Sequence, residues 1–131
     1  MNYEELIEAI QSVLTPDLLK KEYRGQDDKH FTYGHCYAAC DALYELIGRK
    51  ESGFTPHCAK DENGITHWWL QRGEEILDPT KEQYTSDGVS PPYSKGKGKG
   101  FLTKEPSKRA RKIIKRIRDD GNSIQRSDLD Q

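Results

Sequence analysis

Apolar residues recur every three or four positions along the first segment of the chain. Between Tyr3 and Leu19 they fall at Leu6, Ile7, Ile10, Val13 and Leu14. This spacing places them on one face of an α-helix. The Thr15-Pro16 pair predicts where the helix ends, because proline breaks a continuing helix. We therefore expect an amphipathic packing helix, followed by a polar loop over residues 20–32.

A second helical pattern begins at Cys36. Strong helix formers follow this residue, apolar residues fall at positions 39, 43, 46 and 47, and Gly48 is a stop signal. We expect a mostly buried helix that carries Cys36 in its first turn.

Three short segments after this helix are typical of β-strands. They cover residues 53–60, 66–71 and 75–77, and the turn signals 61–64 and 72–73 separate them. Two consecutive hairpins predict an antiparallel sheet of at least three strands. We assign residues 1–85 to one core domain.

The C-terminal part of the chain changes character. Residues 86–104 are rich in Pro, Gly, Ser and Lys, which predicts a flexible loop. Ser107 is a candidate N-cap for a basic amphipathic helix over residues 105–118, which would dock on the core through one apolar stripe. That stripe consists of Ala110, Ile113, Ile114 and Ile117. Residues 119–131 are expected to be a polar tail.

Charge is distributed unevenly along the chain. The 131 residues carry a net charge of −1 and are 33% charged and 33% hydrophobic, with a mean hydropathy of −0.98. Residues 94–118 hold eleven basic residues and one acidic residue, whereas the remainder has a net charge of −11. This pattern predicts an acidic body with a basic arm that can contact an anionic partner.

The sequence also bounds the class of protein. It has no apolar run long enough for a membrane span, and its acidic N-terminal segment does not fit a secretory signal. Three cysteines, an odd number, favour free thiols in a reducing compartment. We expect a soluble cytoplasmic protein that does not contact membranes.

Three residues form a candidate catalytic set. A thiolate is a nucleophile when its charge is stabilised, and a helix N-terminus and a nearby imidazolium both do this. Cys36 lies at a predicted helix N-terminus. His67, on the second strand, could supply the imidazolium and carry the proton. Asp78 ends the third strand, so a turn near Gly73 would bring it beside His67 to hold the imidazole in one tautomer.

Short stretches around these residues resemble papain-like and transglutaminase-like proteins. Gly34-His35-Cys36-Tyr37-Ala38 is similar to the start of their nucleophile helix. His67-Trp68-Trp69 and Asp78-Pro79-Thr80 are similar to the His-x-Trp and Asp-Pro-Thr stretches of the transglutaminase core, which also occur in peptide N-glycanase-like and arylamine acetyltransferase-like relatives. The resemblance covers residues 33–84, under half of the chain.

This resemblance implies a role for each residue. Cys36 would be the nucleophile, His67 the general base and acid, and Asp78 the orienting carboxylate. The backbone N–H of Cys36 would help to form an oxyanion hole. Papain-like proteins add an upstream glutamine to that hole, for which this chain offers Gln26 or His30. We expect no cofactor, since the chain has no phosphate-binding glycine motif.

Substrate contacts are expected in two places. Beside the nucleophile they come from Tyr33 and from one of Trp68 and Trp69, because neighbours on a strand face opposite sides. One tryptophan then belongs to the core and the other walls the groove. On the basic helix the expected contacts are three cations, Arg109, Lys112 and Arg116.

Each candidate also has a plain structural alternative. Cys36 could be an ordinary buried thiol and His67 a satisfied interface histidine, and Asp78 could simply start a turn. Cys40 and Cys58 are interpreted as packing residues. A zinc site is a further alternative, but the spacing fits poorly, because structural zinc usually binds two closely spaced ligand pairs, and we expect no metal. The possible ligands are His35, Cys36, Cys40, His57, Cys58 and His67.

Taken together, the patterns predict an α+β fold in which the nucleophile helix packs on a small antiparallel sheet, flanked by an N-terminal helix and a C-terminal basic helix. The expected function is thiol-dependent acyl transfer on an amide of a protein or peptide. Water as acceptor would give a peptidase, amidase or deamidase, and an amine would give a transglutaminase or acyltransferase. The alternative is a noncatalytic module that binds nucleic acid or another polyanion through the basic arm.

Overall fold

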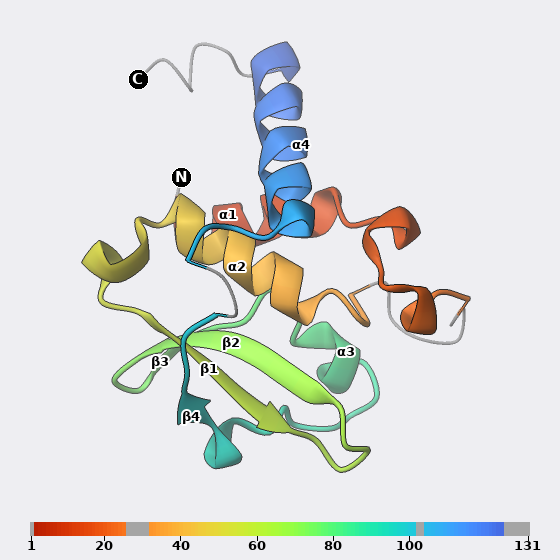
Figure 1. The fold of residues 1–131 in the computed structure, drawn as a ribbon, viewed down its shortest axis with the longest axis vertical. Helices are drawn as coiled ribbons and strands as arrows, with labels where there is room; N and C mark the ends of the chain where they lie inside the picture. The colour runs from red at the N-terminus through yellow and green to blue at the C-terminus, as the bar shows by residue number, and fades with distance from the viewer. Residues whose placement is uncertain (1, 26–31, 102–103, 125–131) are drawn as a thin grey trace.

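The fold is a mixed α+β arrangement, as the sequence predicts. The computed structural model describes residues 2–25, 32–101 and 104–124, which contain four α-helices and one four-stranded antiparallel sheet (Figure 1). The helices are α1 (Tyr3–Ser12), α2 (Cys36–Leu46), α3 (Glu82–Thr85) and α4 (Lys108–Ile124). The strands are β1 (Thr55–Lys60), β2 (Thr66–Arg72), β3 (Glu75–Leu77) and β4 (Lys97–Gly98). Short 3₁₀ turns lie at Pro16–Leu18, Lys21–Tyr23, Arg49–Ser52 and Tyr93–Lys95.

The two N-terminal helices have the boundaries that their sequence signals indicate. In α1, the Asn2 side chain accepts a 2.8 Å hydrogen bond from the Glu5 N–H and caps the helix, which ends shortly before Pro16. Helix α2 begins at Cys36 and ends before Gly48, whose φ of 104° is the left-handed conformation that favours glycine. The predictions of both helices are confirmed.

The sheet has the strand order β3-β2-β1-β4. Its central pair places Cys58 opposite Trp68, and the next pair places Leu70 opposite Leu77. Trp68 and Leu70 belong to the core that α2 covers. Tyr84 and Tyr93 cover Trp69 and His67 on the other side of β2, so both faces of the strand are buried.

The segment predicted as a flexible loop over residues 86–104 is partly ordered as β4, and this correction has a packing reason. His57 of β1 pairs with Gly98. A Cβ on Gly96 would lie 2.1 Å from the Trp69 ring, so only glycine lets the backbone pack on that tryptophan. The Lys-Gly alternation therefore allows the backbone to approach the sheet closely at Gly96.

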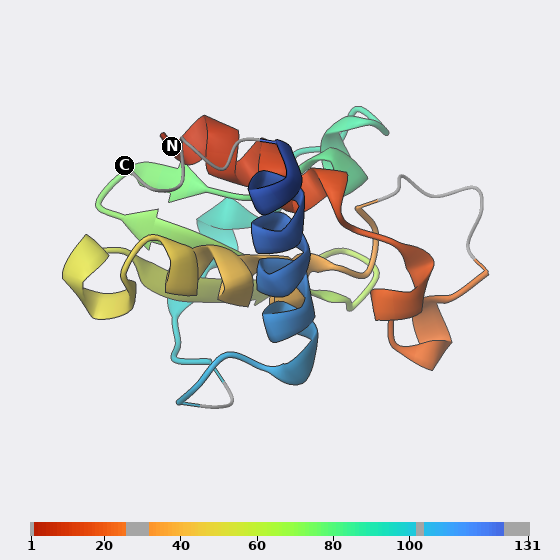
Figure 2. The same cartoon turned by 90° about the horizontal axis from the view of Figure 1, so that it is seen from above.

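Helix α4 docks on the body through its predicted apolar stripe. The Ser107 hydroxyl accepts a 3.2 Å hydrogen bond from the Ala110 N–H, which confirms the N-cap, and Ile113 is fully buried. Figures 1 and 2 show α4 crossing α2, with its C-terminal end reaching away from the sheet. The helix runs to Ile124, so its predicted end at residue 118 is wrong. One stabilising contact beyond that point is the 2.9 Å ion pair of Lys115 with Asp119 at the i,i+4 spacing.

Across the described residues, the structure contains no helix with the length and apolar character needed to cross a membrane.

Candidate active site

The structure places Cys36 at the first position of α2, next to a tightly packed turn. Gly34 has a φ of +83°, and a Cβ there would lie 2.9 Å from the Leu19 side chain and 3.0 Å from that of Tyr23. Glycine is therefore required at this position by both backbone conformation and space. Cys36 is 9% exposed, and its Sγ lies 3.5 Å from the backbone oxygen of Thr66, the residue before His67.

His67 and Asp78 form a buried hydrogen-bonded pair. Their atoms Nε2 and Oδ2 are 2.6 Å apart, and the two side chains are 0% and 1% exposed. The register explains the contact, because Leu77 pairs with Leu70 and the next residue along β3 falls beside the strand that carries His67. The sequence-predicted neighbourhood of residues 67 and 78 is confirmed.

Asp78 is held by more than the histidine. The Tyr93 hydroxyl donates a 2.7 Å hydrogen bond to Oδ2, and the Thr80 N–H donates a 3.1 Å hydrogen bond to Oδ1. Three donors on one buried carboxylate fix its orientation and compensate its lost hydration. Burial and the charge of Asp78 also raise the pKa of Tyr93, so this hydroxyl remains protonated and can donate.

The second ring nitrogen of His67 faces the remaining polar groups of the site. Nδ1 lies 3.1 Å from the Gln83 amide nitrogen, which donates a 3.2 Å hydrogen bond to the Thr80 hydroxyl. Because Nε2 is committed to Asp78, Nδ1 is the atom left to exchange a proton with a thiol.

The charge state of His67 reflects opposing effects. Burial lowers its pKa, while hydrogen bonds and charge interactions with Asp78 and Cys36 raise it, and the net result is a pKa of about 9. Cys36, whose charge contributes to this shift, is the third candidate residue at the same site. At neutral pH His67 is therefore a cation.

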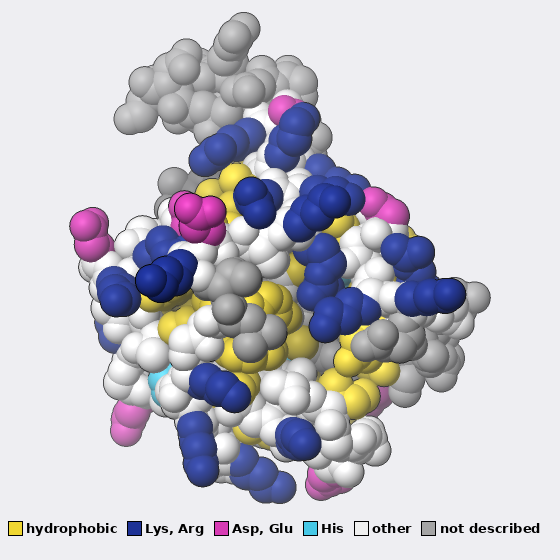
Figure 3. Space-filling view, viewed as in Figure 1, with side chains coloured by type: hydrophobic (Ala, Val, Ile, Leu, Met, Phe, Trp, Pro, Cys, Tyr) yellow, Lys and Arg dark blue, Asp and Glu magenta, His cyan; other side chains and the backbone are white. Residues whose placement is uncertain are grey.

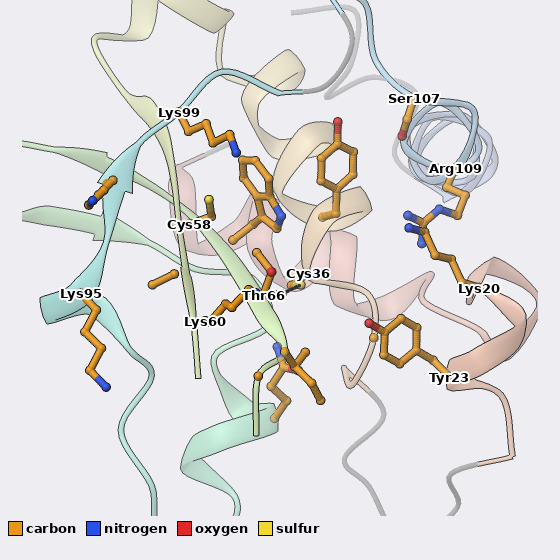
Figure 4. A pocket seen from close by; sticks show the side chains of 18 residues that line it. Lys20, Tyr23, Cys36, Cys58, Lys60, Thr66, Lys95, Lys99, Ser107 and Arg109 are labelled. Carbon is orange, nitrogen blue, oxygen red and sulfur yellow. Dashed lines mark hydrogen bonds between the residues drawn. The ribbon is translucent and has the colours of Figure 1, made fainter. Parts of the chain in front are cut away.

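Cys36 opens into a cavity of about 850 Å³ between β1, the β4 segment and the start of α4. Trp68 and Tyr37 form part of its apolar wall, and Gln83 reaches its edge. Figure 4 shows Cys36 in the middle of this cavity, with Lys99 on one side and Arg109 on the other.

The two tryptophans face opposite sides of β2, as the alternation of side chains along a strand requires. Trp68 lines the cavity and packs edge-on against Tyr37. Trp69 is fully buried and stacks near His67 at a centroid distance of 5.9 Å, so it belongs to the core of the opposite face. Tyr33 does not line the Cys36 cavity; it lines a neighbouring cavity of about 370 Å³.

Of the three cations expected to contact substrate from the basic helix, only Arg109 lines the cavity beside Cys36. Lys112 is exposed on α4 and does not line it. Arg116 forms a 2.7 Å ion pair with Asp17 and donates a 3.0 Å hydrogen bond to the Val13 carbonyl, so it ties α4 to the N-terminal segment.

Several residues of the site could not be identified from the sequence. Gln83, Tyr93 and Thr80 reach His67 and Asp78 from residues 79–95, which fold back over the sheet. Among these three residues only Thr80 had a local sequence signal, because it belongs to the Asp78-Pro79-Thr80 stretch. Gln26 and His30, the predicted second donors of the oxyanion hole, lie outside the described residues.

The other cysteines differ in environment. Cys40 is fully buried, and this burial raises the pKa of its thiol well above the ordinary value. Cys58 is partly buried, packs against the core and also lines the cavity. All three cysteines are free, and the described residues contain no cluster of three or more His, Cys, Asp or Glu side chains arranged to hold a metal ion.

No family model matches the chain, and comparisons with curated proteins and with solved structures likewise find no match.

Proposed function

We propose that the protein catalyses thiol-dependent acyl transfer with Cys36, His67 and Asp78 arranged as in papain-like and transglutaminase-like proteins. The observation that carries this proposal is a connected chain of contacts at the N-terminus of α2. His67 bonds to Asp78 at 2.6 Å, Cys36 Sγ lies 3.5 Å from the backbone oxygen of Thr66, the residue before His67, and Cys36 opens into the cavity. A buried packing thiol would require neither the ionic pair nor the open cavity.

The proposed reaction starts from an ion pair in which His67, protonated at Nδ1, holds the proton that Cys36 has given up. The thiolate sulfur then attacks the substrate carbonyl carbon, and the carbonyl oxygen takes up the electron pair as an oxyanion. The backbone N–H of Cys36 belongs to the first turn of α2, where helix geometry leaves it without an acceptor in the helix, so it can donate to this oxygen.

Collapse of the tetrahedral intermediate breaks the carbon–nitrogen bond. His67 returns its proton to the leaving nitrogen, which departs as an amine, and the acyl group remains on Cys36 as a thioester. Water or a second amine then gives a proton to His67 and attacks the thioester, and the histidine finally reprotonates the released thiolate. Asp78 holds the imidazole throughout and stabilises its cationic form.

Selective alkylation tests the central step of the proposal. Cys58 is more exposed than Cys36, so exposure alone predicts that iodoacetamide modifies Cys58 first. We expect the opposite order at pH 7, with Cys36 modified at least about tenfold faster and this advantage lost in His67→Ala. Mass spectrometry of the separate cysteine peptides gives all three rates from one sample.

Two comparisons keep this test specific. Cys58→Ser is the matched control and should leave the Cys36 rate unchanged. Native protein in which Cys58 reacts faster than Cys36, or in which His67→Ala keeps the full Cys36 rate, would contradict the proposal.

A second candidate function, polyanion binding, is favoured by the surface of α4. Figure 3 shows Lys and Arg side chains gathered over one face of the molecule. Arg111, Lys112 and Lys115 are exposed on this helix. If they bind nucleic acid, the triple variant with Glu at all three positions should lose the salt-sensitive binding of a 20-nucleotide DNA. Fluorescence anisotropy of labelled DNA measures this binding. Equal anisotropy changes for both proteins would exclude this role.

A further inference from the structure

The charge lining the Cys36 cavity is one-sided. Six cations line it, and within the described part of the chain no carboxylate does. They are Lys20, Lys60, Lys95, Lys97, Lys99 and Arg109. These residues come from the N-terminal segment, β1, the β4 region and α4, so the fold gathers them from four parts of the sequence.

None of these six cations forms an ion pair within the described residues. The ion pairs formed by lysine and arginine in the described residues lie elsewhere, at Arg49, Arg72, Lys115 and Arg116. Arg109 donates only a long hydrogen bond, 3.5 Å, to the Leu18 carbonyl. Figure 4 shows Lys20 and Arg109 on one side of Cys36, with Lys95 and Lys99 on the other. A cavity with unpaired charges of one sign focuses its potential on whatever occupies it.

The neighbouring cavity has the opposite character. It shares Ile65, Gln83 and Lys95 with the first cavity, but its lining includes Asp61, Glu62 and Asp87. The two cavities therefore differ in charge, since the carboxylates line only the second one and five of the six cations line only the first. General basicity of the surface does not explain this segregation, since the whole chain has a net charge of −1.

Building on the proposed function of Cys36, we infer that its substrate is an acidic segment of a protein or peptide, with carboxylate side chains flanking the amide that reacts. The cations would hold those carboxylates, while Trp68, Tyr37 and Tyr23 supply apolar surface for the peptide backbone. A nucleic acid offers the same charge but no amide with an amine leaving group in its backbone. An acidic peptide satisfies both the charge of the cavity and the chemistry of the thiol.

Two small alkylating agents of nearly equal size measure the potential at Cys36. Iodoacetate is an anion and iodoacetamide is neutral. Relative to the same ratio for N-acetylcysteine, the iodoacetate-to-iodoacetamide rate ratio at Cys36 should rise about tenfold at about 0.01 M salt, where screening is weak. It should return towards the N-acetylcysteine value at about 1 M salt, where the Debye length is about 3 Å.

Charge variants locate the effect. Lys60→Gln combined with Lys99→Gln should reduce the elevated ratio at least about threefold, because both lysines line the cavity. The matched control is Arg111→Gln combined with Lys112→Gln, which removes the same charge from the exposed surface of α4 and should leave the ratio near that of the native protein.

Peptide probes identify the occupant. Two peptidyl acyloxymethyl ketones that differ only in glutamate or glutamine on both sides of the reactive group would be compared at low salt. We expect the glutamate probe to modify Cys36 at least about tenfold faster, with the difference lost in the Lys60 and Lys99 double variant.

The results separate the two levels of the proposal. Slow iodoacetamide modification of Cys36 would overturn the proposed nucleophile whatever the charge effects. Fast iodoacetamide modification with equal rates for the glutamate and glutamine probes would leave the nucleophile standing and overturn the acidic substrate. Protection of Cys36 by a 20-nucleotide DNA, without a glutamate preference among the peptide probes, would overturn it in favour of a polyanion.

Discussion

At the scale of single residues, the hydrogen-bond partners of Asp78 distinguish a site residue from a turn residue. Asp78 accepts hydrogen bonds from His67, Tyr93 and Thr80, so its carboxylate is constrained from both oxygens. The structural alternative for Asp78 was that it only starts a turn. An aspartate in that role needs only the hydrogen bond from the Thr80 N–H. The bonds from His67 and Tyr93 show that Asp78 does more than start a turn.

The pKa of His67 provides a direct measurement of this environment. It is raised to about 9, and Asp78 supplies one of the hydrogen bonds and charges responsible. In Asp78→Asn, loss of the negative charge should lower the pKa of His67 by at least about one unit. The titration of the His67 ring protons followed by NMR checks this value.

Asp87→Asn is the matched control, because Asp87 is exposed and is not among the described residues that contact His67. Its His67 titration should coincide with that of the native protein. If acyl transfer uses His67 as the acid that protonates the leaving amine, the alkaline limb of kcat/KM should also lie near pH 9 and move down in Asp78→Asn. An unchanged His67 titration in Asp78→Asn would contradict the role given to this carboxylate.

At the scale of elements, the sequence predicted those whose signals are local. The stripe and caps of α1, α2 and the start of α4 lie within a few residues of one another, and so do the turns between β1, β2 and β3. The β4 strand escaped prediction because its partner is His57, about forty positions earlier in the chain. Gln83 and Tyr93 escaped for the same reason, since only tertiary contact brings them to His67 and Asp78.

The end of α4 illustrates a different cause. The polar sequence from Asp119 onwards indicated a tail, but the helix continues through Gly121. The i,i+4 pair of Lys115 with Asp119 instead supports continuation of the helix. Glycine weakens a helix by only about 1 kcal/mol, which such contacts and packing of the preceding turns can offset.

The segment around β4 makes a sharp prediction about packing. Gly96→Ala adds a methyl group 2.1 Å from the Trp69 ring and should lower the free energy of unfolding by about 1–3 kcal/mol, because a buried tryptophan has no space to move into. Gly100→Ala is the matched control in the same Lys-Gly stretch, with nothing within 4 Å of the new methyl. It should change stability by less than about 0.5 kcal/mol.

Urea denaturation of the two variants measures this difference. Because Tyr93 lies three residues before Gly96 and donates to Asp78, Gly96→Ala should also slow Cys36 alkylation at pH 7. Equal stability of Gly96→Ala and Gly100→Ala would show that Trp69 is not held in place by this segment.

At the scale of the whole molecule, the uneven charge of the sequence has two structural outcomes. Part of the basic arm turns inward, with Arg109, Lys97 and Lys99 around the candidate nucleophile. Another part anchors the arm, since Arg116 pairs with Asp17 of the N-terminal segment. A buried carboxylate completes the attachment, because Asp41 of α2 accepts a 2.8 Å hydrogen bond from the Ser107 N–H at the start of α4.

Two buried histidines with opposite pKa shifts should also give the molecule a stability that depends on pH on both sides of neutrality. Burial, reinforced by the charge of Arg109 and opposed by that of Asp17, lowers the pKa of His35 from 6.5 to about 4. His35 is 1% exposed and its Nδ1 has no hydrogen-bond partner among the described residues, so the folded protein favours its neutral form. The pKa of His67, in contrast, is raised from 6.5 to about 9.

The direction of each effect follows from proton binding. Below pH 6.5 the unfolded chain protonates His35 more readily than the folded protein does, so the stability due to His35 is lost as the pH falls from 6.5 towards 4. For His67 the folded protein binds the proton more tightly, so its contribution is complete below pH 6.5 and is lost as the pH rises towards 9. The two contributions together place the greatest stability near pH 6.5.

Urea denaturation at a series of pH values, applied to the native protein and to two single variants, separates these contributions. His35→Gln should flatten the stability curve between pH 4 and 6.5 and leave the curve above pH 6.5 unchanged in slope. His67→Gln should flatten the curve between pH 6.5 and 9 and leave the acid side unchanged. Differences between curves cancel the titration of groups that the variants share, including buried Asp41, whose pKa is raised chiefly by burial. An acid limb in His35→Gln as steep as that of the native protein would show that the unpartnered imidazole at the start of α2 is not what makes the fold sensitive to acid.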